Sequence, residues 1–177
     1  MLNKQYTSML QEKDVIFEIF QYATERAKVV GAENIYDFSL GNPSVPAPSI
    51  VNETIVQKVN TLDPLALHGY SPSFGIMETR EKIAAFLNKK YGSSYKASNI
   101  FMAIGAAGAL AHAFRAVTNP GDEIITFAPC FSEYKPYTAG AGLKLTIIPA
   151  DIDTFQINFA AFEAQLNENT TAVLINS

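Results

Sequence analysis

Short apolar runs alternate with helix-like stretches through the second half of the chain, and this alternation restricts the possible folds more than any other feature. From residue 99 onward the apolar runs are "NIFMAI", "EIITFA", "LKLTIIPA" and "TAVLIN". The segments between them, residues 107–117, 131–139 and 159–166, have helical character and are bounded by Gly, Pro or Asn. Because strands this apolar need helices on both faces, the pattern predicts a mainly parallel, doubly wound α/β sheet. Ligands of such sheets bind at the carboxyl ends of the strands.

The first half of the chain is typical of helices joined by stiff loops. Apolar residues recur at helical spacing from residue 14 to residue 30, with Gly31 at the expected stop, and from residue 76 to residue 91, with Gly92 at the stop. A third helix is predicted for residues 48–59. We expect a short strand at "IYDFSL", a stiff loop at "GNPSVPAP", and a turn at Asp63 and Pro64.

Composition excludes several classes of partner. The chain has 177 residues, of which 48% are hydrophobic, and its net charge is −4 without a basic run, so nucleic acid and anionic membranes are not expected partners. Charges throughout the first twenty residues exclude a signal peptide or membrane anchor there. The single cysteine, Cys130, cannot form an internal disulfide, which favours a reducing, cytoplasmic setting.

The strand-to-helix turn in "IGAAGALAHAF" carries almost no side chains. The backbone N–H groups of Ala106 and Ala107 are therefore open at a helix N-terminus, where a phosphate would bind. Small residues equally allow a helix to pack closely on a sheet, and the motif alone does not separate the two interpretations. It is neither a P-loop nor G-x-G-x-x-G.

The segment "NPGDEIITFAPCFSEY" places Phe131 after a strand, at the same sheet edge as that turn. Its ring could stack on a planar ligand or could instead attach the next helix to the core. Cys130 has no evident histidine partner and is expected to be a buried structural thiol. The two histidines, His68 and His112, lack metal-site spacing, so no metal site is predicted.

Four stretches, in this order and at these separations, resemble the pyridoxal-phosphate-dependent aminotransferases of the aspartate aminotransferase type, fold type I. They are "SLGNPSVPAP", "HGYSPSFGIMETREKIAAFL", "IFMAIGAAGALAHAFRAVTNPGDEIITFAPCFSEY" and "TAVLINS". Each motif is loose, but together they cover nearly the whole chain. The resemblance implies pyridoxal 5′-phosphate as cofactor and a three-layer α/β sandwich with a mainly parallel sheet.

The resemblance also implies roles for individual residues. In the family the turn at Gly105, Ala106 and Ala107 holds the cofactor phosphate, although many relatives have Ser or Thr hydroxyls there and this chain has none. Phe131 stands where an aromatic ring stacks on the pyridine ring. Gly41 stands where a backbone N–H meets the substrate carboxylate.

Tyr70, in the "GYSPSFG" turn, resembles the tyrosine that reaches across a homodimer to the partner subunit's cofactor phosphate. A homodimer is therefore expected. As for domains, the resemblance implies an N-terminal arm and part of the small domain in residues 1–47, and the first half of the large cofactor-binding domain in residues 48–177.

The family's Schiff-base lysine follows the segment that this chain resembles. The asparagine and aspartate that contact the cofactor ring, and the arginine that binds the substrate carboxylate, also follow it. Lys135 and Lys144 do not match the Schiff-base lysine, so we expect no catalytic residue among residues 1–177 and no activity from them alone.

The implied activity of the full-length protein is transfer of an amino group from an amino acid to a 2-oxo acid through a cofactor Schiff base. A lyase or decarboxylase of the same fold is an alternative, since the discriminating residues include those that follow. A non-catalytic α/β module that binds a phosphorylated small molecule is another.

Overall fold

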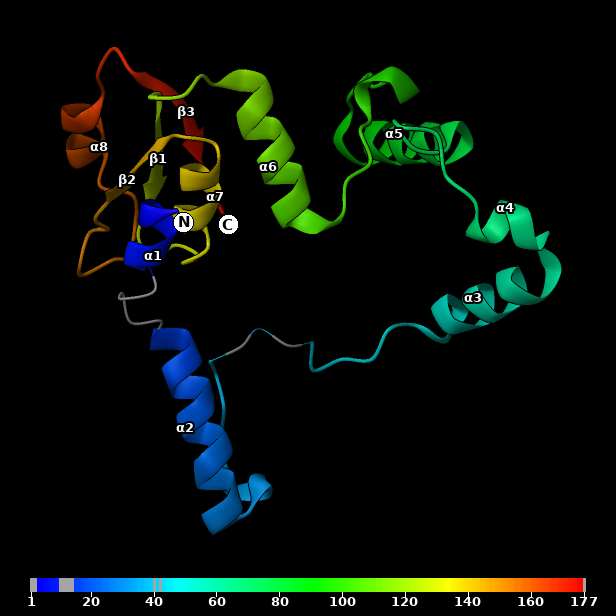
Figure 1. Ribbon diagram of the computed structural model, residues 1–177, viewed down its shortest axis with the longest axis horizontal. Coiled ribbons are helices and arrows are strands. Elements are labelled where there is room, and N and C mark those ends of the chain that lie inside the picture. Colours follow the sequence, from blue (N-terminus) through cyan, green and yellow to red (C-terminus); the bar gives the residue numbers. More distant parts are fainter. Residues whose placement is uncertain (1–2, 10–14, 40, 42, 177) are drawn as a thin grey trace. The chain divides into compact units, whose positions relative to one another are not determined.

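The computed structural model describes residues 3–9, 15–39, 41 and 43–176. Its chain divides into two units, and Figure 1 labels their helices and strands. The sheet unit comprises Met1–Asp14 and Ala103–Ser177, and the helical unit comprises Val15–Met102. The domain boundary expected between residues 47 and 48 stays a prediction.

A three-stranded parallel sheet forms the centre of the sheet unit. Its strands are β1 (Glu123–Phe127), β2 (Lys144–Ile148) and β3 (Thr170–Leu174), in the order β2-β1-β3. Ile124 of β1 is paired with Leu145 on one side and with Ala172 on the other. The predicted strands at "EIITFA", "LKLTIIPA" and "TAVLIN" are thus confirmed, as is their parallel arrangement.

Helices cover both faces of this sheet because the strands are apolar on both faces. On one face Ile124 packs with Phe114 of α6 (Gly105–Val117) and with Tyr137 of α7 (Tyr134–Gly140). Phe127 is three residues after Ile124 and therefore points to the opposite face, where its ring lies 5.4 Å from that of Phe162 in α8 (Phe159–Gln165). The α/β architecture predicted from the sequence is confirmed.

The first helix of the chain, α1 (Lys4–Met9), belongs to the sheet unit. The hydroxyl oxygen of Tyr6 lies 2.8 Å from the point that a Cβ on Gly140 would occupy. Gly140 therefore permits α1 to approach the end of α7 closely.

The helical unit contains four helices and two single 3-10 turns within its described residues. They are α2 (Val15–Val30), η1 (Ala32–Asn34), α3 (Ser49–Thr61), α4 (Pro64–His68), α5 (Met77–Tyr91) and η2 (Ala97–Asn99). Gly31 (φ 88°) and Gly92 (φ 66°) end α2 and α5 in left-handed backbone conformations that favour glycine. The helices predicted at residues 14–30, 48–59 and 76–91 are confirmed in their described parts.

Two predicted strands are wrong. The described residues of "IYDFSL" (35–39) and of "NIFMAI" (99–104) lie outside any sheet. An apolar run becomes a strand only when a neighbouring strand completes its hydrogen bonds, and these segments have no paired strand among the described residues. Asp63 and Pro64 begin α4 instead of forming an isolated turn, because the Asp63 carboxylate accepts hydrogen bonds from the N–H groups of Leu65 and Ala66.

Candidate functional site

The N-terminus of α6 lies at the carboxyl edge of the sheet. The chain leaves α6 and enters β1, and α6 packs on Ile124 through Leu110 and Phe114, so the helix runs antiparallel to the strand (Figure 1). The first turn of α6 therefore lies toward the same end of the sheet unit as the carboxyl ends of the strands (Figure 1). This is the edge where parallel sheets bind their ligands.

The first turn of α6 presents free backbone donors. Gly105 has a φ of 66°, and apart from its chain neighbours and the backbone of its own helix no described atom lies within 4 Å of the point that its Cβ would occupy. Ala106 and Ala107 are exposed, and within the described residues no side chain caps the turn at Ile104. The first N–H groups of a helix have no partner inside it, and the helix dipole adds positive potential there.

These donors fit a phosphate group. The amides at the start of this thirteen-residue helix have no side-chain cap among the described residues, so backbone donors are available there, and phosphate binding at this turn stays a prediction. Close packing of the helix on the sheet would be the other reason for small residues here. It applies to Gly108, which is half-buried, but not to Gly105, Ala106 and Ala107, which are exposed.

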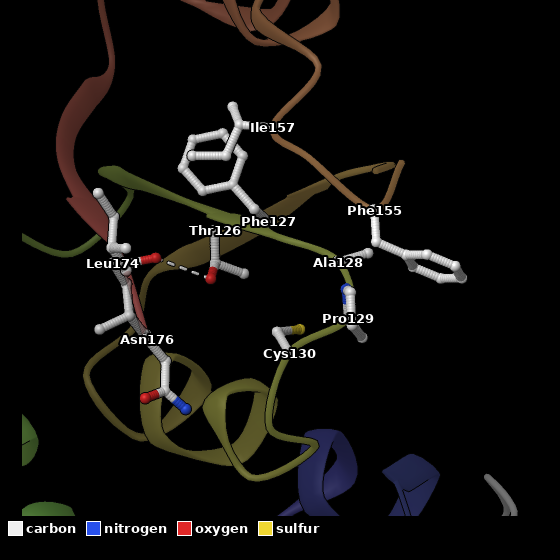
Figure 2. A pocket seen from close by; sticks show the side chains of 10 residues that line it. Thr126, Phe127, Ala128, Pro129, Cys130, Phe155, Ile157, Leu174 and Asn176 are labelled. Carbon is white, nitrogen blue, oxygen red and sulfur yellow. Dashed lines mark hydrogen bonds between the residues drawn. The ribbon is translucent and has the colours of Figure 1, made fainter. Parts of the chain in front are cut away.

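A pocket of about 230 Å³ lies at the same edge of the sheet (Figure 2). It is bounded by the end of β1 at Thr126, by the end of β3 at Leu174, and by the loop that contains Phe155 and Ile157. The Thr126 hydroxyl donates a hydrogen bond of 2.8 Å to the Leu174 carbonyl oxygen, which holds the two strand ends together. This hydrogen bond joins two of the segments that line the pocket.

Phe131 follows the pocket residue Cys130 and is only half covered. Its side chain is 47% exposed, and its ring meets the buried Tyr134 ring edge-on, with centroids 5.8 Å apart and planes at 83°. This edge contact holds the Phe131 ring to α7. The ring is thus both anchored and exposed, and its stacking on a ligand stays a prediction.

Cys130 lines the pocket and is partly buried. Burial raises the pKa of its thiol above the ordinary value, and the positive charge of Lys135 partly opposes this. The thiol is therefore protonated at neutral pH, consistent with a structural role.

Sequence reasoning missed two polar or aromatic contributors to the pocket. Asn176 follows β3, and a search for polar side chains just after each predicted strand would have found it. Phe155 comes from the loop after β2 and has a φ of 56°, unusual for a side chain of this size. No local sequence signal indicates its place in the pocket.

The other two predicted site residues belong to the helical unit. Tyr70 is fully exposed between α4 and α5. Gly41 is exposed in irregular chain, with no described atom within 4 Å of its Cβ position. Their place in a site with Gly105 and Phe131 stays a prediction.

Two further classes of site find no support in the described part of the chain. No group of three His, Cys, Asp or Glu residues there could hold a metal ion. None of the described helices combines the length and the apolar composition needed to span a bilayer.

Comparison with known proteins decides the family. The profile of the family described as "Aminotransferase class I and II" matches residues 32–177. The chain belongs to this family. Family members depend on pyridoxal 5′-phosphate, and the uncapped turn of α6 fits the phosphate of that cofactor.

Several individual members of the family are similar to this chain. A crystal structure of an aminotransferase from Eubacterium rectale shares 47% identity over the whole chain, with a TM-score of 0.91, and the chain covers 45% of it. An aspartate aminotransferase of Thermotoga maritima is 31% identical over 88% of the chain, and a methionine aminotransferase of Escherichia coli is 28% identical over 87%. The chain spans 40% and 39% of the lengths of these two relatives.

Proposed function

We propose that the full-length protein is a pyridoxal-phosphate-dependent aminotransferase that moves an amino group from an amino acid to a 2-oxo acid. The family match over residues 32–177 carries this proposal. The exposed, uncapped turn of α6 supports it, because it lies where the resemblance puts the cofactor phosphate.

In this proposal the chain's own residues hold and orient the cofactor. The amides of Gly105, Ala106 and Ala107 bind the phosphate, and the Phe131 ring lies against the pyridine ring. When bound, the cofactor supplies an electron sink for bonds broken at the substrate α-carbon.

Two residues of the helical unit have roles that this proposal takes from the resemblance. Gly41 offers its backbone N–H to the substrate carboxylate. Tyr70 reaches the partner subunit's cofactor phosphate, which makes the homodimer the functional state. The full exposure of Tyr70 supports this role, since a ring that serves a partner must be free of its own subunit.

Residues 1–177 by themselves are proposed to be inactive. Lys144 is held by Glu123 at the amino edge of the sheet, opposite the candidate site, and Lys135 lies exposed in α7. Borohydride should therefore trap no cofactor on a lysine of these residues, whereas the full-length protein should retain it. A trapped lysine adduct within residues 1–177 would contradict this proposal.

The activity is tested on the full-length protein. Incubation with pyridoxal 5′-phosphate, an amino donor and 2-oxoglutarate should yield glutamate and the 2-oxo acid of the donor. The named relatives act on aspartate and methionine, so both belong in the donor panel. Release of ammonia or pyruvate without an acceptor would instead show a lyase. A protein that binds the cofactor and turns over no donor would be the non-catalytic module.

Two further parts of the proposal have separate tests. Light scattering of the purified protein should give the mass of a dimer.

A reducing, cytoplasmic setting is consistent with the single cysteine, and cell fractionation checks it.

A further inference from the structure

Arg80 is a buried cation in the helical unit. It lies on α5, and 9% of the residue is exposed. Its Nε donates a hydrogen bond of 2.9 Å to the carbonyl oxygen of Ile100. Among the described residues it has no carboxylate partner, although burying a charge costs free energy unless strong local contacts offset the cost. The contacts of the guanidinium with neutral groups therefore indicate what Arg80 does.

The guanidinium holds an aromatic residue of the turn that follows Tyr70. Its Cζ atom lies 5.8 Å from the centre of the Phe74 ring, within the range of a cation–π interaction. Phe101 meets the same ring edge-on, at 6.2 Å and 73°. Phe74 thus contacts Arg80 of α5 and Phe101, which follows η2. The helix α5 and the turn η2 pack against each other.

The backbone of this turn is closed as well. The N–H of Gly75 donates a hydrogen bond of 2.8 Å to the carbonyl oxygen of Pro72. Gly75 has a φ of 88°, and a Cβ there would collide with the side chain of Met102. The turn from Pro72 to Gly75 therefore has one defined path against residues 100–102.

Tyr70 lies two residues before this closed turn. On its other side, Gly69 donates its N–H to the Leu65 carbonyl oxygen at 2.9 Å and ends α4. The Tyr70 ring itself is fully exposed, at 108% of its reference area. The exposed Tyr70 ring thus lies between two fixed points of the backbone, Gly69 at the end of α4 and Pro72 at the start of the closed turn.

We propose that Arg80 is a positioning residue that acts through Phe74 to fix the Tyr70 turn, and so presents the Tyr70 hydroxyl to the cofactor phosphate in the partner subunit. This inference rests on the proposed function. When the Tyr70 hydroxyl is already held in its binding position, little conformational entropy is lost as the phosphate binds. Loosening the turn therefore weakens phosphate binding without removing any group that contacts the phosphate.

The test measures pyridoxal 5′-phosphate dissociation constants of the full-length protein by absorbance titration, alongside circular dichroism of the bound cofactor. The variants are Arg80→Met, Tyr70→Phe, their double variant, and Arg80→Lys as the conservative rescue. Arg80→Met and Tyr70→Phe should each weaken binding about tenfold, and the double variant should be little worse than either, because one acts through the other. Arg80→Lys should recover most of the affinity, since it keeps a cation over Phe74.

Phe74→Leu provides a second route if Arg80→Met folds poorly, because it removes the ring that the guanidinium holds. It should also weaken binding and should add little to Tyr70→Phe. The inference is overturned if the effects of Arg80→Met and Tyr70→Phe multiply, or if Arg80→Met and Phe74→Leu change only the unfolding temperature. Failure of the proposed function has a different signature: the wild type does not bind the cofactor, or Tyr70→Phe leaves its affinity unchanged. Either result also overturns the inference.

Discussion

The ammonium nitrogen of Lys144 lies 2.7 Å from Oε2 of Glu123 and joins the first residue of β2 to the first residue of β1. The Glu123 side chain is 3% exposed, whereas that of Lys144 is 66% exposed. The other carboxylate oxygen, Oε1, is buried and has no hydrogen-bond partner among the described residues. The Asn167 amide also donates to Oε2, at the longer distance of 3.4 Å, so Lys144 is the nearer donor and the only cation paired with this carboxylate among the described residues.

Replacing Lys144 by methionine should destabilise the sheet unit. The change keeps the apolar stem but leaves Glu123 buried without its cation, at a cost of about 1–2 kcal/mol, limited by the exposure of the lysine. Urea unfolding measures the loss. Lys82→Met is the matched control, because its pair with Glu78 is exposed on both sides and should contribute much less. Equal losses in the two variants would contradict the prediction.

The same carboxylate should make stability depend on pH. The hydrogen bond from Lys144 holds the pKa of Glu123 below its ordinary value of 4.5, although burial opposes this shift. A lowered pKa in the folded state contributes stability that is present above the ordinary value and is lost as the pH falls through the lowered value. The stability advantage of wild type over Glu123→Gln should therefore be largest near neutrality and should shrink below pH 4.5. An advantage independent of pH in urea unfolding would contradict the assignment.

Comparing Gly105→Ala with Gly92→Ala should distinguish a loss of cofactor binding from the loss of stability that alanine causes at any such glycine. Gly105 and Gly92 both have a φ of 66°, and neither has a described atom within 4 Å of its Cβ position. Alanine should therefore cost each position about 1 kcal/mol of backbone strain. Only Gly105→Ala should also weaken pyridoxal 5′-phosphate binding, by about tenfold, because only that backbone is proposed to contact the phosphate. A similar change in affinity for Gly92→Ala would show that the effect is indirect.

Cys130 should react slowly with alkylating reagents. Burial raises the pKa of its thiol above the ordinary value of 9.0, and the thiolate is the reactive form. The rate of iodoacetamide modification, followed by mass spectrometry, should still be rising at pH 9. Lys135→Met should lower the rate further, because the lysine charge favours the thiolate. Rapid modification that levels off near pH 7 would contradict the assignment.

Helix boundaries were predictable because their signals act over a few residues. Gly31 and Gly92 end helices through their own backbone conformations. Asp63 and Pro64 were expected to form a turn and instead start α4, although the Asp63 carboxylate that caps it also acts locally. The exposed turn at Gly105 was found in the same way. These features need nothing from distant parts of the chain.

Strands were less predictable because a strand needs a partner. "NIFMAI" and "TAVLIN" are similar in composition, yet only the second contributes a strand, which pairs with β1. The pocket also depends on strand pairing. Phe155 and Asn176 line it together with Cys130 because parallel pairing brings the carboxyl ends of separate strands to one edge of the sheet.

The sequence by itself determined the family, most helix ends and the exposed, uncapped turn at Gly105, since each depends on residues close together along the chain. Only the tertiary structure decided which apolar runs pair, which residues line the pocket and what surrounds Arg80. Those outcomes depend on contacts between segments far apart in the chain, whose packing no local pattern specifies.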